Sequence, residues 1–463
     1  MVSSLTNATR FSEQEFSCTD FGDKRLTRRA VSMAAALARN PVGTLPNAMQ
    51  SLKDIKGAYK FLDNPSVNYE KITAPHRQCT REETELPGEY LLPEDTTELD
   101  FTTHWAAKGL GRIGNDGGRG MMLHSTLALR VLRWSDNRPD LDIVGLWAQR
   151  CWTRTDPPRR GRETHAEHWQ RPRESEKWAH ALAATDGPPP GAKWTLVADR
   201  EADVYETFTR CLDRGVDFIL RATQARALDK SDQSIFDEVA AAPVLGRYEL
   251  FLRARPGQPS RTANIEVRAV SVMIRGPWRP GGQQAPLRLN VVQASEARPS
   301  PAANPLHWVL LTTWACETFD DARKVTAAYA ARWLVEEYHK ALKTGTQVEK
   351  SQLATAKRLQ ALLGIMSIVA VRLLRMKFLV EMDPDQLVEW DAETSAIRAV
   401  LQARFAKPKE GWTNRAVLIS IAKLGGFLGR KSDGNPGWIT VWRGVKELML
   451  QAEGYSIAGA SPR

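Results

Sequence analysis

The segment Tyr329–Lys343 reads YAARWLVEEYHKALK, and its spacing of polar and apolar residues predicts a helix with two different faces. Each residue of an α-helix turns by about 100°. One stripe, only about 60° wide, then carries four polar side chains: Tyr329, Arg332, Glu336 and Lys343. The apolar side chains fall on the opposite side of the helix: Leu334, Val335, Tyr338, Ala341 and Leu342. A solvated helix with intrahelical ion pairs has the same pattern, so the spacing alone leaves open whether the polar stripe is functional.

Two aspartates at predicted strand positions form an acidic set with Glu336. Asp95 follows a short apolar run, and Asp199 ends the predicted strand Lys193–Ala198, which reads KWTLVA. Ligands of α/β proteins gather at the carboxyl ends of strands. Two Asp and one Glu would give an all-oxygen site, which suits Mg²⁺ or Mn²⁺ rather than zinc. Two such ions can activate a water or a 3′-hydroxyl and stabilise the leaving oxygen at a phosphodiester. The intervals between the three acids are not diagnostic by themselves.

The chain around these acids changes its character twice. About the first seventy residues are predicted to be helical. Strands follow over Met121–Trp134 and Leu141–Trp152, and a β-rich part runs from Arg214 to about Trp314. The remainder is helical again, with a long helix over Ala354–Val380 and two helices within Trp412–Tyr455. This order predicts an α/β core with a strand-rich insertion between helical ends.

Composition indicates an anionic partner. The chain of 463 residues has 64 Lys and Arg against 54 Asp and Glu, a net charge of +10. Nucleic acid is the commonest partner of such a chain, although a merely basic protein remains the alternative. The five scattered cysteines form no Cys-x-x-Cys pair, which argues against a zinc ribbon or a disulfide framework and for a reducing cytoplasm. No apolar run approaches the roughly 18 residues of a membrane span, and Met1–Gln14 does not resemble a signal peptide.

A basic cluster opens one of the predicted N-terminal helices. The segment Asp20–Arg39 reads DFGDKRLTRRAVSMAAALAR. Its cationic residues precede an alanine-rich stretch: Lys24, Arg25, Arg28 and Arg29. Such a helix start can place arginines against phosphates, but a solvated basic face of a small helical domain is the alternative.

Other polar residues have simpler interpretations. His165 and His168 have the spacing of two zinc ligands on a helix, but they lie in a charged loop without further ligands. Glu201 and Asp203 follow Asp199 closely. They are expected in the first turn of a helix that starts at once after the strand, where acids interact favourably with the helix dipole.

Several motifs, taken together, resemble one protein family. They are EDTT at Glu94–Thr97, DREAD at Asp199–Asp203, Tyr-x2-Arg-x3-Glu-x6-Lys from Tyr329 to Lys343, GAYKFLDNP at Gly57–Pro65, VAVRLL at Val369–Leu374 and AKLGGF at Ala422–Phe427. In these motifs the chain resembles the cut-and-paste DDE transposases of the insertion-sequence-four family, most closely their transposon-five branch. The resemblance extends from about residue 15 to residue 455, and the Tyr-Arg-Glu-Lys spacing is its most specific part. Leu334 departs from the family, which has a basic residue there.

The resemblance implies an architecture and a set of site residues. The fold would be α/β, a ribonuclease-H-like catalytic core with a β-strand insertion, flanked by helical domains. The implied boundaries are 1–72 for DNA-end binding, 73–375 for catalysis with the insertion at about 222–315, and 376–463 for dimerisation. The metal-binding catalytic triad would be Asp95, Asp199 and Glu336. The residues that grip DNA would be Tyr329, Arg332, Lys343, Trp308 and the N-terminal Lys24, Arg25, Arg28 and Arg29. Trp308 would stack on a flipped base, although most tryptophans in strands belong to the core.

The resemblance also implies a function. Such an enzyme binds transposon ends, cleaves them by metal-dependent hydrolysis and a hairpin intermediate, and joins the 3′ ends to target DNA. Its cofactor would be Mg²⁺, for which Mn²⁺ can substitute. Its partners would be double-stranded DNA and a second copy of the chain in the DNA complex, without a membrane, in the bacterial cytoplasm at the nucleoid. The alternative is a catalytically silent, transposase-derived DNA-binding repressor. A ribonuclease-H-like structural or RNA-processing protein is a third class.

Overall fold

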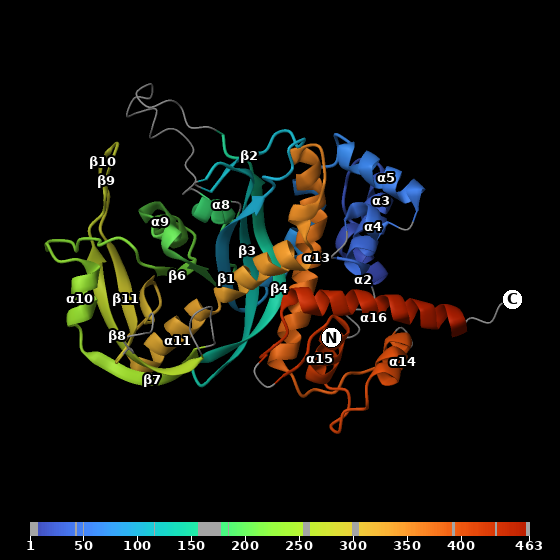
Figure 1. Ribbon diagram of the computed structural model, residues 1–463. Coiled ribbons are helices and arrows are strands. Elements are labelled where there is room, and N and C mark those ends of the chain that lie inside the picture. The colour runs from blue at the N-terminus through green and yellow to red at the C-terminus, as the bar shows by residue number, and fades with distance from the viewer. Residues whose placement is uncertain are drawn as a thin grey trace.

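A central β-sheet covered by helices on both faces forms the core of the computed structural model (Figure 1). The structure describes residues 8–41, 44–49, 51–114, 116–155, 177–183, 185–252, 260–298, 305–390, 394–430 and 433–459. Within this part of the chain, no helix is long and apolar enough to cross a membrane.

The first half of the sheet combines an antiparallel meander with parallel strands. Its strands are β1 (Gly88–Asp100), β2 (Gly111–Ile113), β3 (Gly118–Ser135), β4 (Arg138–Trp152), β5 (Ala192–Ala198) and β6 (Asp217–Arg221). β3 pairs antiparallel with both β1 and β4, whereas β5 lies parallel to β1 and β6 lies parallel to β5. β1 is therefore a central strand, and its two faces contribute to two different cores.

Alternation along β1 decides which side chains reach which core. Leu91 and Leu99 lie in the core on one face, whereas Tyr90 and Leu92 lie in the core on the other. Successive side chains of a strand point to opposite faces. Asp95 therefore shares the face of Leu91 and Leu99, while its neighbour Glu94 points the other way.

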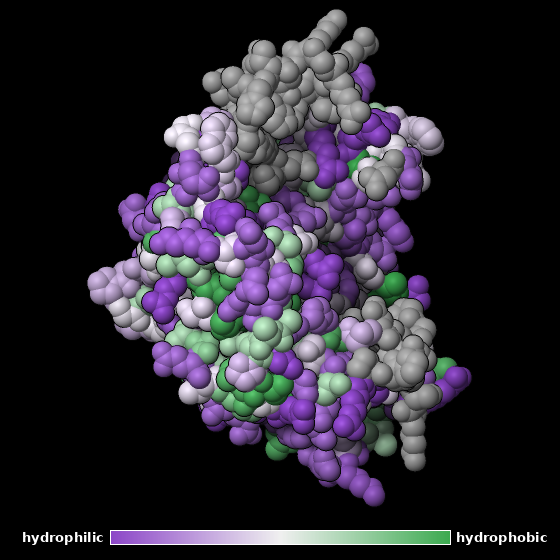
Figure 2. Space-filling model, turned by 90° about the vertical axis from the view of Figure 1, so that its left-hand side faces the viewer, coloured by the Kyte–Doolittle hydropathy of each residue, from purple (hydrophilic) through white to green (hydrophobic). Residues whose placement is uncertain are grey.

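The strand-rich insertion continues the same sheet. Its strands are β7 (Val244–Leu252), β8 (Arg261–Ile274), β9 (Trp278–Arg279), β10 (Gly282–Gln283), β11 (Leu287–Glu296) and β12 (His307–Thr312), with helix α10 (Ile235–Ala241). β12 pairs antiparallel with β6, and β11, β8 and β7 follow outward, while β9 and β10 form a separate hairpin. The face at this end of the molecule is mainly hydrophilic, with apolar side chains interspersed (Figure 2).

Helices from both ends of the chain pack around the sheet. The N-terminal helices are α2 (Ala8–Phe16), α3 (Lys24–Arg39), α4 (Leu45–Ala48), α5 (Leu52–Asp63) and α6 (Tyr69–Thr84). The C-terminal helices are α13 (Ala356–Met382), α14 (Ser395–Arg404), α15 (Asn414–Leu424) and α16 (Trp438–Gly459). α6 packs directly on β4, and α13 lies between the other N-terminal helices and the sheet (Figure 1). The expected boundary at 72/73 falls inside α6 and that at 375/376 inside α13, so each junction is bridged by a continuous helix.

Polar contacts attach the first helices to the core. The carboxylate Oε2 of Glu15 lies 2.7 Å from His76 Nδ1, and the Leu146 backbone N–H donates to His76 Nε2 at 3.0 Å. With Nε2 accepting, Nδ1 carries the proton that is donated to Glu15. Arg372 of α13 also lies 4.7 Å from the ring centre of Phe11. α2 is therefore fixed to α6, β4 and α13.

The predicted continuous helix over Tyr329–Lys343 is wrong. α11 (Phe319–Ala330) ends before Arg332, α12 (Trp333–Lys340) follows, and the next five residues form a π-helical turn, η3 (Ala341–Gly345). Between α11 and α12 the backbone bonds are of the tighter 3₁₀ type, such as Arg332 N to Tyr329 O at 3.0 Å.

Tertiary packing explains this break. α11 packs mainly on β4, β6 and strands of the insertion, whereas α12 packs on β1 and β3, so the two helices contact different parts of the sheet. The expected polar stripe is correspondingly interrupted, because Tyr329 is 4% exposed and belongs to the core. Val335 and Tyr338 are fully buried, as the apolar pattern predicts.

We predict that Gly145→Ala destabilises the fold. Gly145 in β4 has φ of +153°, and a Cβ there would lie 2.4 Å from Thr80 Oγ1 and 2.9 Å from His76 Nε2. Overpacking of this kind costs about 1–3 kcal/mol, so the melting temperature should fall.

The matched control is Gly454→Ala in α16, where a Cβ would meet no atom within 4 Å. This control should be neutral or stabilise by up to about 1 kcal/mol, because alanine favours helices over glycine. Equal melting temperatures for the two variants would contradict the assigned packing of α6 on β4.

Candidate active site

Two of the predicted acids stand beside each other on neighbouring strands. β1 and β5 are parallel, and their register pairs Pro93 with Val197. Asp95 comes two residues after Pro93, and Asp199 comes two residues after Val197. The register of the two strands therefore places Asp95 opposite Asp199. Adjacent strands lie about 4.8 Å apart, and residues two apart share a face. The sheet therefore places the two carboxylates next to each other on the face that α12 covers.

α12 adds the third acid through an arginine. Arg332 Nη1 lies 3.6 Å from Asp95 Oδ2, and Arg332 Nη2 donates a hydrogen bond to Glu336 Oε1. The guanidinium thus stands between a carboxylate of the sheet and a carboxylate of the helix. All three groups are only partly exposed.

The environment of Asp95 disfavours its negative charge. Burial raises the pKa of Asp95 to about 6, and the charges of Asp199 and Glu336 act in the same direction. The Thr96 backbone N–H, which donates to Asp95 Oδ1 at 2.8 Å, and the Arg332 guanidinium partly oppose the rise. Three neighbouring carboxylates in such a place need a cation to be held together at neutral pH.

Asp199 begins a short helical turn rather than a long helix. Its Oδ1 accepts the Glu201 backbone N–H at 3.0 Å, and the 3₁₀ turn η2 (Arg200–Ala202) follows. The α-helix α9 (Tyr205–Asp213) starts only later, so the expected immediate helix is interrupted. This turn separates the three acids of the DREAD motif.

The interpretation of Asp203 as a helix-dipole acid is wrong. Asp203 is 1% exposed, and its Oδ1 lies 2.6 Å from Arg226 Nη2. The backbone N–H groups of Thr223 and Gln224 donate to its Oδ2 at 2.8 and 2.9 Å. Asp203 therefore anchors η2 to the chain that follows β6. Glu201, the other acid, is exposed and pairs at 2.8 Å with Lys177, whose side chain is buried.

The other residues expected to contact DNA lie in two places, around Tyr329 and at the end of β1. Tyr329 packs edge-on against Trp308, with ring centres 5.1 Å apart, and Arg332 lies 6.0 Å from the Tyr329 ring centre. Lys343 contacts the end of β1 instead: its Nζ donates to the Glu98 carbonyl at 2.9 Å. Trp308 is partly buried on β12 and packs against the core.

Sequence reasoning missed Arg221. This residue ends β6, the strand beside β5, and its Nη2 donates to the His307 carbonyl at 3.0 Å. Burial lowers the pKa of Arg221, while Tyr329 acts in the opposite direction and Arg332 in the same one. A second guanidinium therefore lies beside Tyr329 and Arg332. The only signal in the sequence is a basic residue at a strand end, which becomes informative once β6 is known to neighbour β5.

Glu94 of the EDTT motif points away from the other acids. It is fully buried, its Oε2 accepts from Thr126 Oγ1 at 3.1 Å, and His124 Nε2 lies 3.5 Å away. Burial raises the pKa of Glu94 well above its ordinary value and lowers that of His124 to about 3. Burial thus disfavours the charged form of both side chains, and they support β1 from behind Asp95.

The carboxylates of Asp95, Asp199 and Glu336 suit a hard divalent cation, but they lie too far apart to share one ion. Among the described residues, no three His, Cys, Asp or Glu side chains lie close enough to hold a metal ion. The residues that would hold one are Asp95, Asp199 and Glu336, which supply only oxygens. The Arg332 guanidinium stands in for a cation between two of them. His165 and His168 lie outside the described residues.

The N-terminal basic cluster occupies the first two turns of α3. Lys24, Arg25 and Arg28 are exposed. Arg25 pairs with Asp23 at 2.9 Å, which caps the helix. Arg29 is half-buried and pairs with Asp54 of α5 at 3.0 Å, so it also joins two helices of this region.

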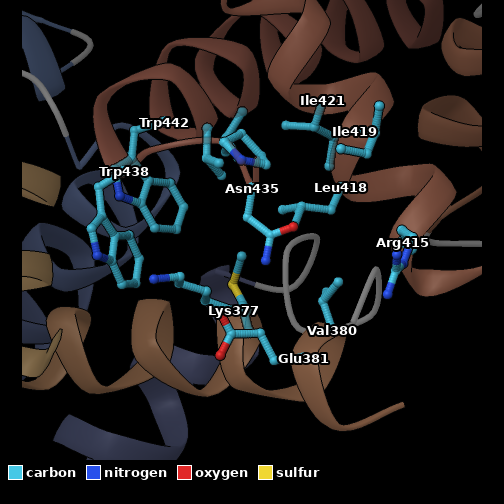
Figure 3. A pocket seen from close by; sticks show the side chains of 14 residues that line it. Lys377, Val380, Glu381, Arg415, Leu418, Ile419, Ile421, Asn435, Trp438 and Trp442 are labelled. Atoms are coloured by element: carbon cyan, nitrogen blue, oxygen red, sulfur yellow. The ribbon is translucent and has the colours of Figure 1, made fainter. Parts of the chain in front are cut away.

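An apolar cavity of about 170 Å³ lies between α13, α15 and α16, away from the three acids. Trp438 and Trp442 form one side of it, and Leu418 with Ile419 forms another (Figure 3). At its edge, Lys377 Nζ and Trp438 Nε1 donate to Glu337 Oε2 at 2.5 and 3.2 Å. Glu337 is the residue after Glu336, so α12 contacts the C-terminal helices directly beside the candidate site.

Three family models match the chain. A transposase DNA-binding model matches residues 8–67, and a transposase DDE domain model matches residues 176–372. A model of the Tn5 transposase dimerisation domain matches residues 365–461. The DDE match covers β5, β6, the insertion and the chain as far as α13; together with the mixed sheet it indicates a ribonuclease-H-like core, which confirms the predicted fold class.

We predict that Asp95→Asn stabilises the fold at alkaline pH. The folded-state pKa of about 6 exceeds the ordinary 3.8, so the stability of the native chain falls as the pH rises through this window. The amide carries no charge and avoids this loss, which amounts to at most about 3 kcal/mol.

Denaturant unfolding of both proteins at pH 8 and near pH 4.5 would measure the difference. The advantage of the variant should be largest at pH 8 and shrink as the pH falls. A variant that is less stable than the parent chain at pH 8 would contradict the assigned environment of Asp95.

Proposed function

Because the chain belongs to the Tn5-like DDE transposases, we propose that it cuts DNA at transposon ends and joins the resulting 3′ ends to target DNA. DDE transposases are metal-dependent enzymes that cleave DNA and transfer strands, and this chain is a DNA transposase with DNA-binding and dimerisation regions. The observation that carries the assignment of the site is the convergence of Asp95 and Glu336 on Arg332, with Asp199 in register beside Asp95.

The proposed catalytic residues are Asp95, Asp199 and Glu336, with Mg²⁺ as the metal and Mn²⁺ as a substitute. When bound, the metal would activate a water or a 3′-hydroxyl and stabilise the leaving oxygen. The protein side chains fix the geometry: the parallel strands β1 and β5 hold the two aspartates, and α12 brings Glu336 over them.

The basic side chains would hold the DNA backbone near the scissile bond. Arg332 and Arg221 both lie near Tyr329, and Arg332 contacts two of the carboxylates. Guanidinium groups bind phosphate through two parallel hydrogen bonds, and a tyrosine hydroxyl can donate another. Lys343, at the end of β1, would contact a phosphate further along the strand. These contacts would orient the scissile phosphodiester toward the three acids.

The cleavage is proposed to pass through a DNA hairpin. The first strand is cut by hydrolysis, and its new 3′-hydroxyl attacks the opposite strand. The hairpin is then reopened to give a blunt end. Trp308 lies next to Tyr329 and would stack on a base that is flipped out during this step. Its partial burial against the core is the competing explanation of its position.

The flanking regions would bind the DNA ends and pair two protomers. We assign end recognition to residues 1–72, catalysis to 73–375 and dimerisation to 376–463. The exposed Lys24, Arg25 and Arg28 on α3 are suited to phosphate contacts, whereas the ion pair of Arg29 with Asp54 gives it a structural part as well. Two protomers would process two ends on the bacterial nucleoid, with one chain binding the end that the other cuts.

The alternative is a catalytically silent DNA-binding repressor derived from a transposase. Such a chain would keep the N-terminal helices and lose selection on the acids. The neighbouring Asp95 and Asp199, with Glu336 above them, favour the enzyme. Metal-dependent cleavage of end DNA separates the two functions.

We predict that Asp95→Ala, Asp199→Ala and Glu336→Ala each abolish cleavage and strand transfer but leave end binding largely intact. The acids would hold the metal, whereas binding comes mainly from Lys and Arg contacts to phosphates. The substrate would be a duplex with the inverted repeats that border the coding sequence, and gel-shift and cleavage assays would be run side by side.

The matched control is Glu201→Gln, an exposed acid of the same DREAD motif that pairs with Lys177. It should cleave normally. Full cleavage by any of the three alanine variants would remove that residue from the site. Normal binding without cleavage by the parent chain, in Mg²⁺ and in Mn²⁺, would favour the repressor.

We predict that Trp308→Ala slows hairpin formation more than the first nick. Stacking of a base on an aromatic side chain contributes about 1–3 kcal/mol, and only the hairpin step would use it. Trp308→Phe keeps an aromatic face and should retain most of the rate. Rates of the two steps can be followed on end-labelled duplexes. Equal slowing of both steps together with a lower melting temperature would assign Trp308 to the core alone.

A further inference from the structure

Arg332 occupies the space between two of the acids that would bind metal. Its Nη1 lies 3.6 Å from Asp95 Oδ2, and its Nη2 donates to Glu336 Oε1. The side chain is only 16% exposed, so these ion pairs are partly shielded from water. Charges in such a place interact more strongly than on an open surface.

A metal ion would need the same carboxylate oxygens. Mg²⁺ binds oxygens at about 2.0–2.1 Å, so oxygens that share one ion lie within about 4 Å of each other. A guanidinium between Asp95 and Glu336 is a much larger group than the ion and carries the same sign of charge. The described residues contain no cluster of acids close enough for a metal, which agrees with Arg332 holding these two apart.

The same guanidinium has a second chemical partner available. Arginine binds carboxylate and phosphate with the same planar fork of donors. Arg332 Nε is buried and has no hydrogen-bond partner among the described residues, so one donor remains for another acceptor. Tyr329 and Arg221 lie near Arg332 and could contact the same phosphate. Arg332 also lies between α11 and α12, where its backbone makes 3₁₀-type bonds to Tyr329 and Val335.

We propose that Arg332 is an internal cation that keeps the metal site closed in the DNA-free chain, and that a DNA phosphate draws it away so that metal can bind. This inference rests on the proposed function of the three acids. Binding of DNA and binding of metal would then strengthen each other. Coupling between two sites is typically about 5- to 150-fold in affinity, and it is the same in both directions.

The first experiment measures Mn²⁺ binding to the full-length, DNA-free chain by electron paramagnetic resonance of the free ion. Arg332→Gln should bind Mn²⁺ about 5- to 150-fold more tightly than the parent chain, because the competing cation is gone. Arg332→Lys keeps the charge but loses the planar fork, so its affinity should lie between the two. The matched control is Arg221→Gln, which removes a neighbouring positive charge and should change the affinity by less than about threefold, since salt screens charges that are not in contact.

A second experiment uses the parent chain alone. Its Mn²⁺ affinity should rise when a duplex with already cut inverted-repeat ends is added, after subtraction of Mn²⁺ bound by the DNA itself. Cut ends offer no first strand to hydrolyse, so the readout is metal binding and not turnover. Equal affinity with and without DNA would overturn the proposal, whatever the stability of the variants.

Mn²⁺ binding by single and double variants separates the role of Arg332 from that of the metal site itself. Equal Mn²⁺ affinity of the parent chain and Arg332→Gln, both folded by melting temperature, would make Arg332 a structural ion pair only and would overturn the proposal. If Asp95→Asn and Asp199→Asn leave Mn²⁺ binding of the Arg332→Gln protein unchanged, the proposed metal site itself is wrong. Loss of binding in these double variants, together with tight binding by Arg332→Gln, would support both.

Discussion

The repulsion among three neighbouring carboxylates is the constraint on which the rest of the structure depends. Asp95 lies on β1, Asp199 directly follows β5 and Glu336 lies on α12, far apart in the sequence, and burial adds to the cost of the Asp95 charge. The parallel pairing of β1 with β5 keeps two of them side by side. α12 then has to cross β1 at a place where Glu336 reaches the sheet, and Arg332 supplies the compensating charge.

The surroundings of the site are organised around this arrangement. Behind β1, Glu94 and His124 form a buried polar layer on the opposite face of the sheet. Beside β5, the pair of Asp203 with Arg226 fixes the turn that follows Asp199. The insertion continues the sheet from β6 and so delivers Trp308 to Tyr329 without a separate domain interface. Each of these contacts restrains a segment that carries a site residue.

The sequence allowed much of this to be predicted, because the strands have clear apolar patterns and the motifs of the family are specific. The positions of Asp95 and Asp199 on strands followed from local runs such as KWTLVA. The break at Arg332 did not, because AARWL has no residue that ends a helix and the break results from packing on two parts of the sheet. The partner of Asp203 lies 23 residues away, and Arg221 becomes relevant only when β6 is placed beside β5. Such non-local contacts leave no periodic trace in the sequence.

Glu336 and Glu337 are adjacent in the chain but belong to different environments. Glu336 faces Arg332 and the sheet, whereas Glu337 accepts hydrogen bonds from Lys377 of α13 and Trp438 of α16. The helix that carries Glu336 therefore contacts the region that matches the dimerisation model directly. Substitutions in the C-terminal helices would move Glu337, which is bonded directly to Glu336 of the proposed site. Selection that preserves α12 should therefore also act on the helices of the dimerisation match that contact it. The sequences of these two regions should change together in evolution rather than independently.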